Sequence, residues 1–262
     1  MRTFLKRRYK RFKAHYARYV YNKNAPYLKQ YDRVYHVHIR KSAGTSINSA
    51  FWNIAGLNLK SVKRKALLIK GSYVFVRNNE NLINDGCYFY ANSHIPYWNL
   101  NIPTNTFVFC MLRDPYKRLV SLYRYLKWVK DLDPKEATSI EPYYNTIYKQ
   151  TVWLGNSFND FLDNVPMKHI QNQLYMFSET GNVEEALHNI SKLDAIYHQE
   201  KFEEAITDLS LLIGKELQVK KERVFGKNET IVISYEEELK AREKLAKAYQ
   251  FYNNVQLKVA KK

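Results

Sequence analysis

The sequence predicts an α/β fold with a central, largely parallel sheet flanked by helices. Short apolar runs rich in aromatic and β-branched residues alternate along the chain with stretches whose apolar residues recur at helical spacing. Strands that alternate with helices favour a parallel sheet, because each helix returns the chain to the same end of the sheet. The 262 residues, of which 45% are hydrophobic, are enough for one large domain.

The first strand and the first helix of this domain are expected on either side of a polar turn. Residues 34–39, VYHVHI, are rich in β-branched and aromatic residues, which predicts a short buried strand. From Thr45 onward, apolar residues recur on one side of a helix. These residues are Ile47, Ala50, Phe51 and Ile54. The turn between them, RKSAGTS, therefore joins a strand to a helix.

This turn has the composition of an anion site. A helix N-terminus offers unpaired backbone N–H groups and the positive end of a dipole, and Gly44 lets the backbone approach a ligand closely. Four side chains add donors: Lys41, Ser42, Thr45 and Ser46. A phosphate or sulfate group would fit, although a capped loop with a solvated Lys remains an alternative. A Walker A loop is not indicated, because here the Lys precedes the only Gly.

Two later strands are expected to end beside this turn. Residues 87–94, CYFYANSH, predict a strand that ends at His94. Residues 107–112 form a continuous apolar run that ends at Arg113, after which Asp114 can cap a helix and Pro115 fits its first turn. Ligands of parallel sheets bind at the carboxyl ends of the strands, so Lys41, His94 and Arg113 should share one site.

The N-terminal segment, residues 1–31, is predicted to be a basic amphipathic helix outside the main domain of residues 32–262. This segment contains no carboxylate side chain, since the first acidic residue of the chain is Asp32, and apolar residues recur along it at intervals of four and three. These are Leu5, Tyr9, Phe12, Tyr16 and Tyr19. Such a stripe could lie on an anionic membrane surface or pack on the domain or on a second copy. It is too interrupted by charge for a signal peptide or a membrane span.

Charge and cysteine content limit the classes of function. The net charge of +17 implies acidic partners, and a non-catalytic nucleic-acid-binding protein is one alternative. The aromatic residues show no RNA-binding signature and no zinc finger is present, so nucleic acid is not the expected partner. Cys87 and Cys110 lie in strand-like runs and lack neighbours at metal-ligand spacing, which indicates buried thiols in a reducing compartment.

Two motifs resemble those of a known enzyme family. The segment VYHVHIRKSAGTSI is similar to the 5′-phosphosulfate-binding motif of sulfotransferases that use 3′-phosphoadenosine 5′-phosphosulfate (PAPS), and LRDPYKRLVSLYRYL resembles their 3′-phosphate motif. The likeness is to the carbohydrate branch, related to heparan sulfate 2-O- and 6-O-sulfotransferases and to bacterial sulfotransferases. It continues from about Tyr35 to the C-terminus and implies the P-loop-like sulfotransferase fold.

The resemblance also implies roles for individual residues. The 5′-phosphosulfate would be bound by Lys41, Ser42, Gly44, Thr45 and Ser46, and the 3′-phosphate by Arg113 and Ser121. His94 matches the catalytic base, since a neutral imidazole can take a proton from a sugar hydroxyl. Lys41 would neutralise charge on the oxygen that leaves with adenosine bisphosphate, and no metal is then required.

Two further cations depart from the family pattern or extend it. Arg40 stands where the family usually has Pro, so it either adds a cation to the cradle or points outward. Lys227 either belongs to a loop that closes over the nucleotide or is an exposed side chain in a turn. Ser93 replaces the Gly that often precedes the catalytic His.

The expected function is transfer of a sulfuryl group from PAPS to a carbohydrate hydroxyl. The acceptor would be a cell-surface or capsular glycan, and the insert of residues 131–156 is the candidate acceptor flap. Tyr97 and Trp98, just after His94, could stack on sugar rings, although aromatic residues this numerous mostly form core. The expected location is the bacterial cytoplasm, with peripheral attachment to the inner membrane through the N-terminal helix. A kinase with a similar phosphate loop remains a second alternative. The sequence does not determine the oligomeric state.

Overall fold

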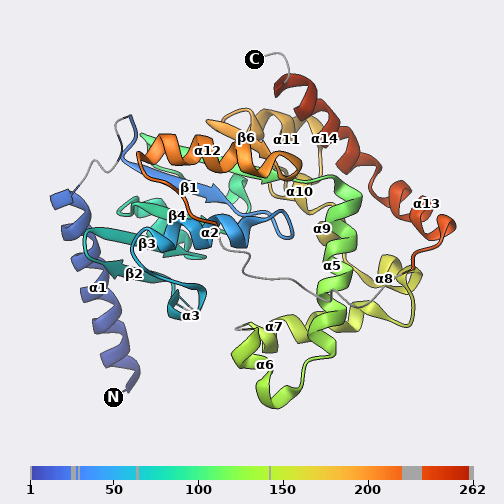
Figure 1. Cartoon of the computed structure of the whole chain (residues 1–262), viewed down its shortest axis with the longest axis horizontal. Coiled ribbons are helices and arrows are strands. Elements are labelled where there is room, and N and C mark those ends of the chain that lie inside the picture. Colours follow the sequence, from blue (N-terminus) through green and yellow to red (C-terminus); the bar gives the residue numbers. More distant parts are fainter. Residues whose placement is uncertain are drawn as a thin grey trace.

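A six-stranded sheet forms the centre of the protein (Figure 1). The computed structural model describes residues 2–24, 28, 30–62, 65–141, 143–219 and 232–259. The strand order is β2-β3-β4-β1-β5-β6, and every neighbouring pair is parallel except β2 and β3. The strands are β1 (Arg33–Val37), β2 (Leu67–Lys70), β3 (Tyr73–Arg77), β4 (Tyr90–Ser93), β5 (Thr106–Leu112) and β6 (Ala195–His198). The predicted α/β class and largely parallel sheet are confirmed.

Helices cover both faces of the sheet, as the alternation of side chains along the strands requires. On one face, Tyr35 of β1 packs in a core with parts of α1, α11 and α14. On the other, the neighbouring Val34 packs in a core with α2 and α12. These helices are α1 (Arg2–Asn24), α2 (Gly44–Asn53), α11 (Val183–Ile190), α12 (Phe202–Ile213) and α14 (Ala246–Val259). Short helices α3 (Leu59–Val62), α4 (Glu80–Asp85) and α10 (Asn172–Tyr175) join them.

Helix α5 (Pro115–Lys130) leads the chain away from the sheet into a second, helical layer (Figure 1). Asp114 caps it by accepting a bond of 2.8 Å from the backbone N–H of Lys117, as predicted. Its predicted apolar stripe is buried: Leu119, Leu122, Leu126 and Val129. The layer also contains α6 (Pro134–Ile140), α7 (Tyr144–Tyr148), the 3₁₀ turn η2 (Lys149–Leu154), α8 (Phe158–Asn164), α9 (Met167–Ile170) and α13 (Tyr235–Lys244). The 3₁₀ turns η1 (Tyr97–Asn99) and η3 (Gln199–Lys201) follow strands β4 and β6.

The N-terminal helix differs from one of its two sequence interpretations. It ends at Asn24, and its buried residues are Ala17, Val20 and Tyr21. The predicted aromatic stripe lies on a different side of the helix and is exposed. The interpretation that this stripe packs on the domain is therefore wrong. None of the described helices is long and apolar enough to cross a membrane.

The two cysteines are separate thiols. Cys110 lies in β5 and is fully buried, as predicted, and burial raises the pKa of its thiol. Cys87, predicted to be buried, is only half-buried. It lies before β4, and its Sγ contacts the carbonyl oxygen of Asp85.

We expect the packing of α5 to determine much of the stability of the domain. Leu126→Ala should lower the free energy of unfolding by about 2–5 kcal/mol, because Leu126 is fully buried and the shorter side chain leaves a cavity beneath α5. Lys130→Ala, on the exposed side of the same helix, is the control and should change stability little. Urea denaturation of both variants measures this; equal stabilities would contradict the packing described.

Candidate active site

Three of the predicted residues follow neighbouring strands. Lys41 follows β1, His94 follows β4 and Arg113 follows β5. The register pairs Val37 at the end of β1 with Ser93 of β4 and with Cys110 of β5. The three segments therefore leave the sheet at the same edge, where ligands of parallel sheets bind.

The turn between β1 and α2 has an unusual backbone. Lys41 and Ala43 adopt left-handed conformations, with φ of 67° and 58°, although neither is glycine. Such residues cost energy and persist where the surrounding structure requires them, often at binding sites. Alternation of right- and left-handed residues turns successive N–H groups toward one point. Ala43 is also the N-cap of α2 and supplies no side-chain bond to its first turn, which favours an anion as partner.

Gly44 is required by a neighbouring histidine. A Cβ atom at this position would lie 2.0 Å from Cδ2 of His38, so only glycine allows the ring to pack against the start of α2. His38 itself is buried and its ring lies 4.2 Å from that of His94. The sequence analysis missed His38, because a histidine at the end of a strand resembles any other strand residue.

The hydroxyl residues of the turn differ in their surroundings. Ser42 is buried, and its hydroxyl has no hydrogen-bond partner among the residues that the structure describes. A buried polar atom without a partner is costly, so it commonly marks the place of a water, an ion or a ligand. Thr45 and Ser46 are half-buried in the first turn of α2.

His94 is held in one tautomer. Its backbone N–H donates to Oδ1 of Asn78 over 2.9 Å, and its Nδ1 lies 2.7 Å from the carbonyl oxygen of His38. Since a carbonyl can only accept, Nδ1 must bear the proton, and Nε2 keeps a lone pair. The side chain is exposed, yet protein atoms surround the ring closely enough that desolvation, followed by the charge of Arg40, lowers the pKa of the imidazole. His94 is thus neutral near pH 7.

Arg113 is fixed at both ends. The side-chain amide of Gln173 accepts from its backbone N–H and donates to its carbonyl, each over 2.8 Å. Its Nη1 donates to the carbonyl oxygen of Lys41 over 3.2 Å, which connects β5 to the turn. The Nε atom is buried without a partner in the described part of the chain. Gln173 is a second residue that the sequence analysis did not single out, because it lies sixty positions from its partner.

Ser121 and Arg113 line the same cavity. This cavity has a volume of about 500 Å³ and is otherwise lined by Tyr116, Lys117, Val120, Arg124 and Ile233. Three cations and a hydroxyl therefore face one space beside α5, which suits a phosphate group. The predicted spacing of Arg113 and Ser121, a strand end and a position two turns into the next helix, produces this arrangement.

Arg40 and Arg118 both lie inside the protein. Arg40 is half-buried and donates from Nη2 to Oε1 of Gln150 in η2 over 3.1 Å, so it does not point outward. Arg118 is buried and donates from Nη2 to the carbonyls of His169 and Ile170. Desolvation and then the charges of Arg40 and Arg113 lower the pKa of Arg118. Positive charge is thus concentrated on the α5 side of the turn.

The Lys41 side chain extends toward the same helix. Its Nζ lies 4.1 Å from the ring centroid of Tyr125 in α5. The Tyr125 hydroxyl donates to Oε2 of Glu141 over 3.0 Å, and Glu141 is fully buried. Lys41 therefore contacts a residue that is bonded to the insert of residues 131–156. That insert is largely helical, with α6, α7 and η2.

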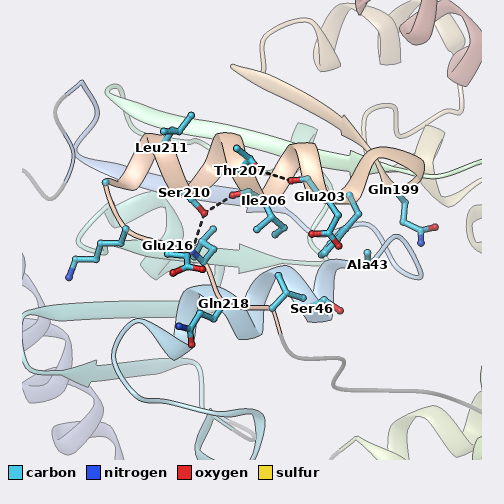
Figure 2. Close-up of a pocket in the computed structure, with 15 residues that line it drawn as sticks. Ala43, Ser46, Gln199, Glu203, Ile206, Thr207, Ser210, Leu211, Glu216 and Gln218 are labelled. Carbon is cyan, nitrogen blue, oxygen red and sulfur yellow. Dashed lines mark hydrogen bonds between the residues drawn. The ribbon is translucent and has the colours of Figure 1, made fainter.

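A second, larger cavity lies on the other side of the turn (Figure 2). It has a volume of about 910 Å³ and extends between α2 and α12. Ala43 and Ser46 line its end next to the turn, Phe202 and Ile206 line its α12 side, and residues 214–219 close it. The space is large enough for a small organic molecule.

The remaining predicted residues either lie outside the described part of the chain or contact other aromatic residues. Lys227 lies outside the described residues. The rings of Tyr97 and Trp98, which follow His94, contact Phe177 and Tyr175, and the Trp98 N–H donates to the Tyr175 carbonyl over 2.9 Å. Within the described ranges, no group of His, Cys, Asp and Glu side chains could hold a metal ion.

A buried polar network connects the core of the sheet to the candidate site. His36 donates from Nδ1 to Oδ1 of Asn48 over 3.0 Å and stacks on Phe109 at 4.6 Å. The same oxygen accepts from the Tyr90 hydroxyl over 2.6 Å, and the Asn48 amide contacts Nδ1 of His38 over 3.1 Å. Asn48 thus connects the core of the sheet to the histidine that orients His94.

His36 should make stability depend on pH. Desolvation lowers its pKa from 6.5 to about 4, so between these pH values the unfolded chain takes up a proton that the folded chain does not. The free energy of unfolding should therefore fall as pH falls through this window, by up to about 1.4 kcal/mol per unit from this group. His36→Gln should have a shallower slope by that amount in urea titrations, and parallel slopes would contradict the burial of a neutral His36.

Comparison of the chain with protein families and with curated protein sequences gives no match to either. A function for this chain must accordingly be argued from the residues and geometry described above.

Proposed function

We propose that the protein is a PAPS-dependent O-sulfotransferase that acts on a hydroxyl of a carbohydrate. The observation that supports this most strongly is the meeting of three groups at one edge of the sheet. They are an anion-binding turn, the fixed Arg113, and the neutral His94 with a free lone pair on Nε2. Sulfuryl transfer needs a bound donor, which the turn and Arg113 would hold at its two anionic ends, and a general base, which His94 would be.

The donor would be held by both of its charged ends. The 5′-phosphosulfate would lie on the turn, where the buried Ser42 hydroxyl lacks a partner among the described residues and Ala43 offers no side-chain cap to the first N–H groups of α2. The 3′-phosphate would lie in the cavity lined by Arg113 and Ser121. The larger cavity beside Ala43 and Ser46 offers space for the nucleoside.

The reaction would proceed by direct transfer. Nε2 of His94 takes the proton of the acceptor hydroxyl, and the oxygen attacks the sulfur of the donor. The bond between sulfur and the bridging oxygen breaks, and adenosine 3′,5′-bisphosphate leaves with the electron pair. Lys41 lies on the turn beside that oxygen's expected position and would neutralise the charge that forms there.

The acceptor would meet the site from the side of the insert. Gln150 in η2 is bonded to Arg40, and Tyr125 of α5 connects Lys41 to Glu141, so the insert contacts Arg40 directly and Lys41 through Tyr125. A loop region held against the reactive residues is a common way to shape an acceptor site. This contact is the reason to propose residues 131–156 as the acceptor-binding flap.

The donor site can be tested by binding. Arg113→Ala should weaken the affinity for adenosine 3′,5′-bisphosphate by roughly tenfold to a hundredfold, since it removes charge-assisted bonds to a phosphate. Lys130→Ala, which removes an exposed cation at the C-terminal end of α5, is the control. Calorimetric titration with the bisphosphate, with ATP and with a duplex oligonucleotide also separates the alternatives. A preference for ATP would favour a kinase, and a preference for the duplex would favour a nucleic-acid-binding protein.

The base can be tested by separating binding from turnover. His94→Ala should leave the affinity for adenosine bisphosphate nearly unchanged and lower the rate of sulfuryl transfer by roughly a hundredfold or more. His188→Ala, at an exposed histidine of α11, is the matched control. A structural role for His94 would instead lower the thermal midpoint and the nucleotide affinity together. Near-normal turnover in a folded His94→Ala variant would refute the base role.

A further inference from the structure

Helix α1 is attached to the domain through its last two turns. Ala17, Val20 and Tyr21 are buried there. The Tyr21 hydroxyl accepts from Nη2 of Arg33, and Nε of the same arginine donates to the carbonyl of Gly86. Arg18 forms an ion pair with Asp85. The preceding residues, 4–12, are all exposed, and the N-terminal end of α1 points away from the sheet (Figure 1).

The exposed part of α1 has an apolar side that no described residue covers. It consists of Leu5, Tyr9, Phe12, Tyr16 and Tyr19, whose exposed fractions range from 49% to 68%. Intervals of four and three place these residues on one stripe along the helix. A contiguous exposed stripe of large apolar residues usually marks an interaction surface, whereas scattered ones do not.

The rest of the helix is positively charged. Residues 2–23 contain nine cations and no carboxylate. The cations are Arg2, Lys6, Arg7, Arg8, Lys10, Arg11, Lys13, Arg18 and Lys23. The exposed ones among them flank the stripe, so any partner of the stripe also meets several positive charges. The partner must accordingly combine an apolar interior with an anionic surface.

We propose that α1 docks on an anionic lipid membrane. A helix that lies in the interface buries its apolar side at the boundary of the acyl chains, while Lys and Arg contact the lipid phosphates. Tyrosine, which makes up three of the five stripe residues, favours this interface because its ring is apolar and its hydroxyl is polar. The buried C-terminal turns of α1 would then hold the α/β domain beside the membrane.

The two other classes of partner fit these features less well. In a pair of copies, stripe against stripe would bring together two helices that each have nine cations and no carboxylate, and like charges repel. Nucleic acid would satisfy the cations but leave Leu5 and Phe12 without an apolar environment, because the recognition of backbone phosphates uses polar and charged side chains.

The experiment is sedimentation of the full-length protein with lipid vesicles. Vesicles of equimolar phosphatidylcholine and phosphatidylglycerol should bind the protein at low salt, whereas phosphatidylcholine alone should bind it weakly, and added salt should release it. Tyr9→Ala/Phe12→Ala should lower the partition coefficient on the anionic vesicles by about tenfold or more. Circular dichroism and the thermal midpoint verify that this variant keeps its helix and its fold.

A matched control removes apolar surface of the same kind elsewhere. Tyr235→Ala/Leu239→Ala changes two exposed residues of α13, whose first turn is acidic, and should not alter vesicle binding. Absence of binding to anionic vesicles at low salt would overturn the proposal. A dimer in analytical ultracentrifugation that Tyr9→Ala/Phe12→Ala abolishes would also overturn it. The same holds if the protein binds a duplex oligonucleotide more tightly than vesicles and the double variant abolishes that binding.

Discussion

The close contact between Gly44 and His38 is the constraint on which the candidate site depends. Because Gly44 has no side chain, the His38 ring packs against the start of α2, where a Cβ atom would lie 2.0 Å away. The carbonyl oxygen of the same histidine accepts from Nδ1 of His94. The turn ahead of Gly44 has both Lys41 and Ala43 at positive φ. His38 thus contacts the start of α2 through its ring and His94 through its backbone.

Positive charge has two effects at this edge of the sheet. Desolvation, followed by the charges of Arg40 and Arg113, lowers the pKa of Arg118, and desolvation followed by the charge of Arg40 lowers those of His94 and His169. The three arginines would supply the charge that a donor with two anionic ends needs. Desolvation and the charge of Arg40 also keep the imidazole of His94 neutral, which a general base must be. The cations that would attract an anionic donor would therefore also help to keep the proposed base neutral.

The sequence predicted the elements whose local signals are strong. The apolar run of β5, the cap at Asp114, the proline that starts α5 and the buried stripe of α5 were all readable from residue type and spacing. Strands β2, β3 and β6 were not predicted. The first two pair with each other across the short turn of Gly71 and Ser72, a local signal that was not used. Strand β6 pairs with β5, which is distant in the chain. His38, Asn48 and Gln173 were missed for the same reason: their importance lies in contacts with residues that are remote or ordinary in the sequence.

For α1 the sequence by itself determined the periodicity and the charge, since a stripe and an absence of carboxylates are local properties. Which side of the helix is buried was decided only by tertiary structure, because Ala17, Val20 and Tyr21 fit against the sheet while the larger stripe does not. The same division holds at the turn. Residue types there indicate an anion, but only the tertiary structure shows the left-handed Lys41 and Ala43, the packing of His38 against Gly44 and the bond from Arg113. Backbone strain of this kind needs contacts from several strands at once, and no local pattern encodes them.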